Sequence, residues 1–283
     1  WPEIRYPDGT EIAPQLDLRF RLNLYTGVRP IRAVPGVAPA LADPRAKDID
    51  LVIIRESTEG LFASRGKGEV IDDREARDTM VITRATSERL FDASFRLAAQ
   101  RKLAGRPGRV TCVDKANVFR SMAFFRKVFL ERARLFPDLV GDTHYIDAMA
   151  LDLVRKPWSF DVMVTENQFG DILSDLGAGL IGGMGFAPSG DIGDAHGMFQ
   201  PSHGSAPDIA GQGIANPTGM FLSAAMMLDW LGTRHGVGAC TEAARMLEDA
   251  VDGAFGQDGV RSADIGGRHG TADVTRTVIA RLA

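Results

Sequence analysis

Residues 160–180 read FDVMVTENQFGDILSDLGAGL, and the organisation of the chain is easiest to see from this stretch. The apolar run at 160–164 is short enough for a buried strand. Apolar side chains then recur at the spacing of one helix face, at Phe169, Ile172, Leu173, Leu176 and Leu180. The stretch therefore predicts a buried strand that leads directly into a helix.

The predicted helix carries two acidic residues on its other side. Asp171 and Asp175 are four residues apart, which places their Cβ atoms roughly 5–6 Å from each other. Two carboxylates that close repel each other unless a cation lies between them. Mg²⁺ or Mn²⁺ prefers such oxygen ligands, although a solvated acidic helix face is the simpler interpretation of this pair alone.

Composition limits the possible classes of protein. With 283 residues, 45% of them hydrophobic, the chain is long enough for two domains or one large one. A net charge of −4 gives no reason to expect nucleic acid or an anionic membrane as a partner. The longest apolar segment, 219–231, is too short to span a bilayer and contains Asp229. Cys112 and Cys240 lack metal-binding spacing and indicate thiols in a reducing compartment, so we expect a cytoplasmic protein.

Predicted strands and helices alternate along the chain, which is typical of an α/β fold. Apolar patterns predict buried strands at 47–55 and 109–114, and helices at 86–103, 121–135, 144–157, 217–231, 239–255 and 271–282. Residues 57–84 favour an extended arm or hairpin, and the glycine-rich segment 177–197 favours a flexible connection. The chain opens with Trp1 in a loop-like stretch, so we expect part of the natural N-terminus to be absent from it.

Five longer motifs follow one another along the chain. They are RESTEG at 55–60, VDKANV at 113–118, YIDAMA at 145–150, NQFGDILSD at 167–175 and HGSAPDIAGQGIANP at 203–217. The last could cradle a phosphate-bearing ligand through backbone N–H groups, but alone it is ordinary turn chemistry. No GxGxxG follows a strand, so the Rossmann fingerprint is missing. In this order the motifs closely resemble the isocitrate/isopropylmalate dehydrogenase family, the metal-dependent β-decarboxylating dehydrogenases.

The resemblance implies a two-domain α/β fold of the isopropylmalate dehydrogenase type, not a Rossmann fold, with the active site in the cleft between the domains. The large cofactor-binding domain would comprise residues 1–25 and 182–283. Residues 26–181 would form the small domain, whose arm at about 57–84 would help to build a homodimer. The implied activity is oxidation of a 2-hydroxy acid with a carboxylate on C3, followed by loss of CO₂.

The family pattern also assigns the substrate and metal residues. Arg19, Arg29 and Arg55 match its substrate-binding arginines, which suits a dianion because guanidinium groups bind carboxylates bidentately. Asn117 and Phe62 fall at further substrate positions. Asp171 and Asp175 match two ligands of Mg²⁺ or Mn²⁺, and Asp147 matches the third, which the family supplies from the partner subunit. Lys115 matches the general base and is also expected to cross the dimer interface.

The cofactor residues are assigned in the same way. The adenosine-binding loop is matched by His203, Gly204, Ser205, Ala206, Pro207 and Ile209, and an adenine contact by Asn216. Asp208 indicates NAD, because a carboxylate there accepts hydrogen bonds from the ribose hydroxyls and repels a 2′-phosphate. Gln200 stands where the family usually has a glutamate near the nicotinamide.

Two positions depart from the pattern and leave the substrate open. Phe62 replaces a tyrosine that donates a proton after decarboxylation, and Gln200 replaces the glutamate. Ala13 and Gln15 differ from isocitrate-specific relatives, so isopropylmalate, D-malate and tartrate are favoured over isocitrate. A member that has lost catalysis and serves as a binding or regulatory subunit is the alternative. The intact metal and base positions favour an active enzyme.

Overall fold

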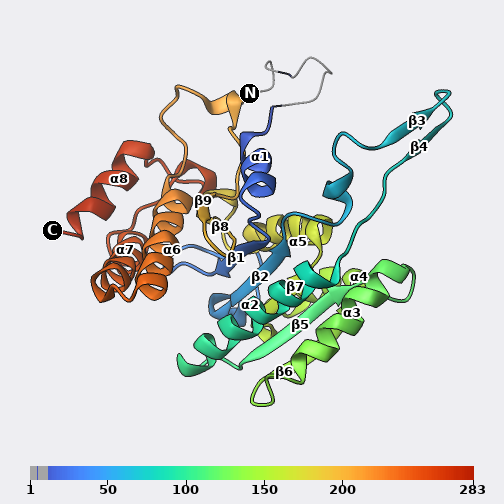
Figure 1. The fold of residues 1–283 in the computed structure, drawn as a ribbon. Coiled ribbons are helices and arrows are strands. Elements are labelled where there is room, and N and C mark those ends of the chain that lie inside the picture. The colour runs from blue at the N-terminus through green and yellow to red at the C-terminus, as the bar shows by residue number, and fades with distance from the viewer. Residues whose placement is uncertain (1–4, 6–11) are drawn as a thin grey trace.

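The structure, a computed structural model, describes Arg5 and residues 12–283. In this part of the chain one mixed sheet of seven strands runs through the molecule in the order β6-β5-β7-β2-β1-β8-β9 (Figure 1). Four neighbouring strands are parallel, whereas β1 runs antiparallel to β2 and β8. The strands are β1 (Thr26–Arg32), β2 (Asp50–Glu56), β5 (Arg109–Asp114), β6 (Val140–Tyr145), β7 (Val162–Thr165), β8 (Pro188–Ile192) and β9 (Gly197–Pro201).

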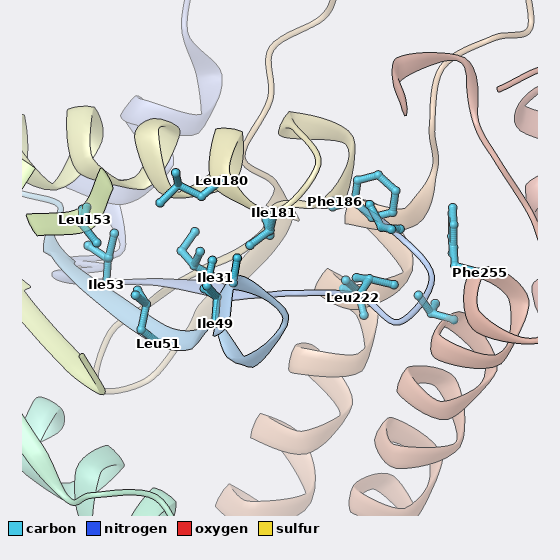
Figure 2. Packing of buried hydrophobic residues seen from close by; sticks show 14 of the residues in the cluster. Ile31, Ile49, Leu51, Ile53, Leu153, Leu180, Ile181, Phe186, Leu222 and Phe255 are labelled. Carbon is cyan, nitrogen blue, oxygen red and sulfur yellow. The ribbon is translucent and has the colours of Figure 1, made fainter. Parts of the chain in front are cut away.

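Helices cover both faces of the sheet, as the predicted α/β fold requires (Figure 1). They are α1 (Pro14–Arg21), α2 (Arg84–Leu103), α3 (Arg120–Ala133), α4 (Ile146–Arg155), α5 (Asn167–Leu180), α6 (Thr218–His235), α7 (Gly238–Gly256) and α8 (Thr271–Ala280). Successive residues of β2 face opposite sides, and both sides are buried. Leu51 and Ile53 enter the core beneath α5 (Figure 2), and Val52 and Ile54 enter the core beneath α2 and α3.

The helices α2 and α3 confirm the inner faces that their sequences predict. Leu90, Phe95, Phe125 and Phe129 are at most 1% exposed. The rings of Phe95 and Phe129 are stacked with their centroids 5.5 Å apart. This aromatic layer fixes the two helices on one face of the sheet.

The segment 177–197 is not simply a flexible connection, as its glycines suggest, because it contains the buried strand β8. The missing side chain of Gly190 makes room for the ring of Phe199 on β9, whose nearest carbon lies 2.8 Å from where a Cβ would be. Glycine here permits close packing of neighbouring strands, which its backbone freedom alone does not reveal.

Two smaller predictions, both of helix boundaries, are also wrong. His144 and Tyr145 end β6, a polar edge strand without the apolar pattern of a buried one, and the helix α4 begins only at Ile146. The helix α6 continues past Gly232, which packs closely against Thr241 of α7, and ends at Gly236 with a left-handed φ of 67°. Neither the helix α1 nor the strand β1 was predicted.

Residues 57–84 do form the predicted arm (Figure 1). Two short antiparallel strands at its end, β3 (Glu69–Ile71) and β4 (Glu75–Arg77), pair into a hairpin that projects from the body of the molecule. Val70 on β3 is 74% exposed. Within the part of the chain described, no helix has the length and apolar character needed to cross a membrane. Cys112 is buried, Cys240 is half-buried, and neither forms a disulfide.

Candidate active site

A cavity of about 480 Å³ lies where α1, α5 and the C-terminal end of β2 meet the end of β9. Its lining side chains are far apart in the sequence. The cavity lies at the carboxyl end of β2, and ligands of open α/β sheets bind at the carboxyl ends of strands. Its lining comprises Gln15, Leu16, Arg19, Arg29, Arg55, Phe62, Asp171, Asp175, Gln200, Pro201, Ser202, His203, Gly204 and Ser205. The three predicted arginines and two of the three predicted metal ligands therefore share one cavity.

Arg55 enters the cavity from the end of β2 and is only 3% exposed. It passes α5 at Gly170, where an added Cβ would lie 2.7 Å from the Arg55 side chain. Its Nε and Nη2 donate hydrogen bonds of 2.9 and 2.7 Å to Oδ1 of Asn167, and its Nη1 donates to Asp171. Its guanidinium lies 5.0 Å from the centre of the Phe62 ring. Burial lowers the pKa of Arg55 to about 10, so the group is cationic at neutral pH.

Arg19 and Arg29 are both held above one buried carboxylate, that of Asp191 on β8. Arg19 Nε donates a hydrogen bond of 2.9 Å to Asp191, and Arg29 Nη2 lies 3.9 Å from it. Arg29 Nη1 donates to Oγ of Ser202 at 3.0 Å. Burial, the largest influence, lowers the pKa of Arg29, and Asp191 acts against that shift.

Asp191, Asn167 and Ser202 were not among the residues predicted for the site. Asp191 lies in the segment interpreted as a connection, and its position depends on strand register: it stands opposite Gly27 of β1. Asn167 lies in a motif that was quoted for its aspartates alone. The available signal was the motif NQFGD itself, since a polar residue at the first turn of α5 reaches back to the end of β2.

Asp171 and Asp175 lie on α5 and line the cavity together. Burial first, and the neighbouring Asp171 carboxylate second, raise the pKa of Asp175. Two repelling carboxylates at the wall of an arginine-rich cavity are an arrangement that a hard divalent cation fits. Among residues 5 and 12–283, no three His, Cys, Asp or Glu side chains come together as a metal site, so this chain places two ligands here and not three.

Ile172, between these aspartates, is 58% exposed and does not belong to the buried face of α5 that was predicted for it. Leu173 and Leu180 of the predicted face are buried, and small residues against which other elements approach closely complete it. At Gly177 an added Cβ would lie 2.9 Å from the side chain of Ile31. The apolar spacing therefore identified Leu173 and Leu180 but not the small residues of the inner face, such as Gly170 and Gly177.

Lys115 and Asp147 lie outside the cavity. Lys115 follows β5, Asp147 lies in the first turn of α4, and their Nζ and Oδ1 atoms are 2.8 Å apart. The hydrogen bond from Lys115 lowers the pKa of Asp147. The Asp147 side chain is 68% exposed and that of Lys115 is 24% exposed, and Asn117 beside them is exposed.

The predicted cofactor loop borders the cavity. His203, Gly204 and Ser205 line it, together with Gln200 of β9. The loop continues through Ala206, which has a left-handed φ of 44°, into a short turn at Pro207–Ile209 with Asp208 exposed. This exposed backbone and carboxylate can receive the sugar and phosphate groups of a dinucleotide.

Asn216 lies farther along and is buried. Its Oδ1 accepts hydrogen bonds from the N–H and hydroxyl of Thr218, and its Nδ2 donates to Asp264. The side chain therefore organises the start of α6. A ligand that contacts Asn216 would have to bind a side chain that is already hydrogen-bonded to Thr218 and Asp264.

Buried arginines can pair with a small anionic ligand, neighbouring carboxylates can bind a cation, and the bordering loop has exposed backbone that can contact a larger ligand. The chain belongs to the isocitrate/isopropylmalate dehydrogenase family, whose model matches residues 4–278. The predicted resemblance and fold class are thereby confirmed.

Relatives of this chain act on different hydroxy acids. It is 44% identical over 266 residues to the 3-isopropylmalate/3-methylmalate dehydrogenase of Methanocaldococcus jannaschii, covering 94% of this chain and 75% of that protein. It is 45% identical over 269 residues to the isocitrate/homoisocitrate dehydrogenase of Thermus thermophilus, covering 94% and 73%. The crystal structure of isocitrate dehydrogenase from Methylococcus capsulatus superposes with a TM-score of 0.87 at 37% identity, covering 99% of this chain and 80% of that one. Such similar identities do not select one substrate.

Proposed function

We propose that this chain catalyses the NAD- and divalent-metal-dependent oxidative decarboxylation of a 2-hydroxy acid that carries a carboxylate on C3. The observation that carries the proposal is the single cavity in which three buried arginines face the Asp171–Asp175 pair. A substrate of the isopropylmalate, tartrate or D-malate type would fit it. Arg19, Arg29 and Arg55 would bind its carboxylates, since buried guanidinium groups lose little further hydration when they pair with an anion.

The residues have distinct roles in the proposed reaction. Asp171 and Asp175 would hold Mg²⁺ or Mn²⁺ together with the partner's Asp147. The partner's Lys115 would take the proton of the 2-hydroxyl group as general base. When bound, NAD⁺ supplies the hydride acceptor and the divalent cation supplies a Lewis acid at the C2 oxygen. Arg55, held by Asn167 and Asp171, would keep the departing carboxylate in place until its bond to C3 breaks and the electron pair remains on the substrate.

A homodimer with shared active sites is part of this proposal. Lys115 and Asp147 lie outside the cavity of their own chain, so a second chain would have to supply them. The helices α4 and α5 pack beside each other and expose Leu151, Val154 and Ile172, each at least 47% accessible. An apolar surface on neighbouring helices suits an interface between two copies of a chain.

The two-domain division and the choice of NAD are proposed on similar grounds. Residues of the proposed large domain, such as Arg19 and Ser202, and of the small domain, such as Arg29 and Arg55, line the same cavity. An active site between the two parts accounts for that. Asp208 is exposed on the bordering loop, where its carboxylate would accept the ribose hydroxyls of NAD.

The test is an absorbance assay of NADH formation with Mn²⁺ and, side by side, 3-isopropylmalate, D-malate, the tartrates and isocitrate. We expect turnover of at least one of the first three. Asp175→Asn should lose both turnover and the thermal stabilisation that Mn²⁺ gives the wild type. Asp258→Asn, a matched change at an exposed carboxylate paired with Arg281, should keep both. A dimeric wild type that is silent with every acid, and that Mn²⁺ does not stabilise, would refute the proposal and favour a non-catalytic member.

A further inference from the structure

Asp191 is a carboxylate with no exposed surface, placed directly behind the substrate arginines. It stands opposite Gly27 in the pairing of β8 with β1. An added Cβ at Gly27 would lie 2.6 Å from Oγ of Ser57 and 3.1 Å from Oδ1 of Asp191. The glycine therefore leaves the space through which Ser57 donates a hydrogen bond of 3.0 Å to Asp191.

The carboxylate serves two arginines that approach from different elements. Arg19 comes from α1 and bonds its Oδ2, while Arg29 comes from β1 and lies near its Oδ1. Arg29 is 4% exposed, and its Nε finds no hydrogen-bond partner within the described chain. The negative charge of Asp191 therefore reduces the positive charge that Arg19 and Arg29 together offer to a ligand.

The consequence concerns the total charge of the site. Asp171, Asp175 and Asp191 together carry as many negative charges as Arg19, Arg29 and Arg55 carry positive ones. A divalent cation on the Asp171–Asp175 pair would leave two positive charges. The partner's Lys115 and the partner's Asp147 carry opposite charges and form a salt bridge of 2.8 Å, so they leave this sum unchanged. Two carboxylates of a substrate would neutralise the two positive charges, whereas a third carboxylate would find no unpaired cationic side chain in the site.

We infer that Asp191 is a specificity-determining residue that restricts the site to substrates with two carboxylates, whose C3 substituent is uncharged. The inference rests on the proposed function and narrows it. It sets isopropylmalate, malate and tartrate, as a class of dianions, apart from tricarboxylates such as isocitrate. Gln15, Leu16 and Phe62 are among the uncharged side chains that share the cavity with the arginines and can receive such a substituent.

The test measures binding to the full chain with Mn²⁺ by titration calorimetry. The probes are D-malate and 3-isopropylmalate, with two carboxylates each, and isocitrate, with three. Wild type should bind the better dicarboxylate at least about 10-fold more tightly than isocitrate, and Asp191→Asn should reduce this ratio at least about 10-fold by removing one nearby negative charge. Asp191→Ser removes the same charge with a smaller side chain and serves if the asparagine variant does not fold.

Two controls separate charge from packing. Ser57→Ala removes the hydrogen bond to Asp191 without changing charge, and Asp252→Asn removes a carboxylate paired with Arg32 at the far end of β1. Both should keep the wild-type ratio. The inference is overturned if wild type binds isocitrate as tightly as the dicarboxylates, or if removal of the Asp191 charge leaves the ratio unchanged. In those cases NADH formation from a hydroxy acid would still support the proposed function. If none of the probes binds wild type and no acid is oxidised, both the role of Asp191 and the proposed function are refuted.

Discussion

The arginine side of the site and the Lys115–Asp147 pair are built in opposite ways. Arg29 and Arg55 are at most 4% exposed and are held by other side chains. Lys115 and Asp147 form a salt bridge with each other, and the Asp147 carboxylate is 68% exposed. The chain thus completes the part of the site that would recognise an anion and leaves the part that would move a proton at its surface.

The buried arginines are held in the cavity of their own chain, whereas the exposed Lys115–Asp147 pair is accessible to a second chain. A buried arginine without partners costs stability, so its contacts must form as the chain folds. An exposed ion pair contributes little to stability and can exchange its partner for a ligand at small cost. The comparison therefore predicts different consequences of mutation on the two sides.

The largest effect is expected from combining one variant of each side. Lys115→Ala and Asp175→Ala homodimers should each be inactive. Heterodimers formed by mixing them after mild dissociation should contain one intact site, if each site takes Lys115 from the opposite chain. Random pairing would then restore about a quarter of wild-type activity. The measurement is NADH formation before and after mixing, with size-exclusion chromatography to follow exchange of subunits.

A mixture of Asp171→Ala and Asp175→Ala provides the control. These two aspartates lie on one helix and line one cavity, so no pairing of the variants creates an intact site. It should stay inactive. If the Lys115–Asp175 mixture also stays inactive despite proven heterodimers, the lysine does not serve the opposite chain.

A smaller effect is expected on the free energy of unfolding, and it differs between the arginine side of the site and the Lys115–Asp147 pair. Asn167→Ala removes the acceptor of two hydrogen bonds from Arg55 and a donor to the carbonyl of Glu59. We expect the free energy of unfolding to fall by about 3 kcal/mol, because the buried guanidinium loses partners. Asp147→Ala should leave it unchanged within error. Urea unfolding followed by circular dichroism measures both, and a comparable loss for Asp147→Ala would show that the exposed pair is structural.

The same contrast explains how far the sequence could be used for prediction. Strands buried on both faces, such as β2, and helices with a wide apolar face, such as α2, have patterns set by burial alone. The strand β8 has no such pattern, because Gly190 makes room for the ring of Phe199 and Asp191 pairs with Arg19. Motif matching singled out Arg19, Arg29, Arg55, Asp171 and Asp175, and the structure brings these five into one cavity, whereas Asp147 lies outside it. It could not find Asp191, because the role of that residue follows from the pairing of β8 with β1.

An effect of similar size that appears only as pH rises concerns Glu56, a buried carboxyl group that lies beyond the cavity. Glu56 follows Arg55 on β2 and faces the opposite side of the sheet. Its carboxylate accepts hydrogen bonds from the N–H and hydroxyl of Thr58 and from the N–H of Glu59. The carbonyl of Glu59 in turn accepts from Asn167, the partner of Arg55. One chain of hydrogen bonds therefore joins Glu56 to the site.

Burial raises the pKa of Glu56 from 4.5 to about 7. The folded state then holds a proton that the unfolded state releases, so this contribution to stability is complete below pH 4.5 and is lost as pH rises towards 7. We expect wild type to lose about 3 kcal/mol over this interval from Glu56. Glu56→Gln should flatten the pH dependence of the free energy of unfolding by that amount, whereas Glu242→Gln, at an exposed ion pair with Arg245, should not. Equal slopes for wild type and Glu56→Gln would mean that the carboxylate is ionised throughout, stabilised by its three hydrogen bonds, and that the buried side of the site is charged as far as the end of β2.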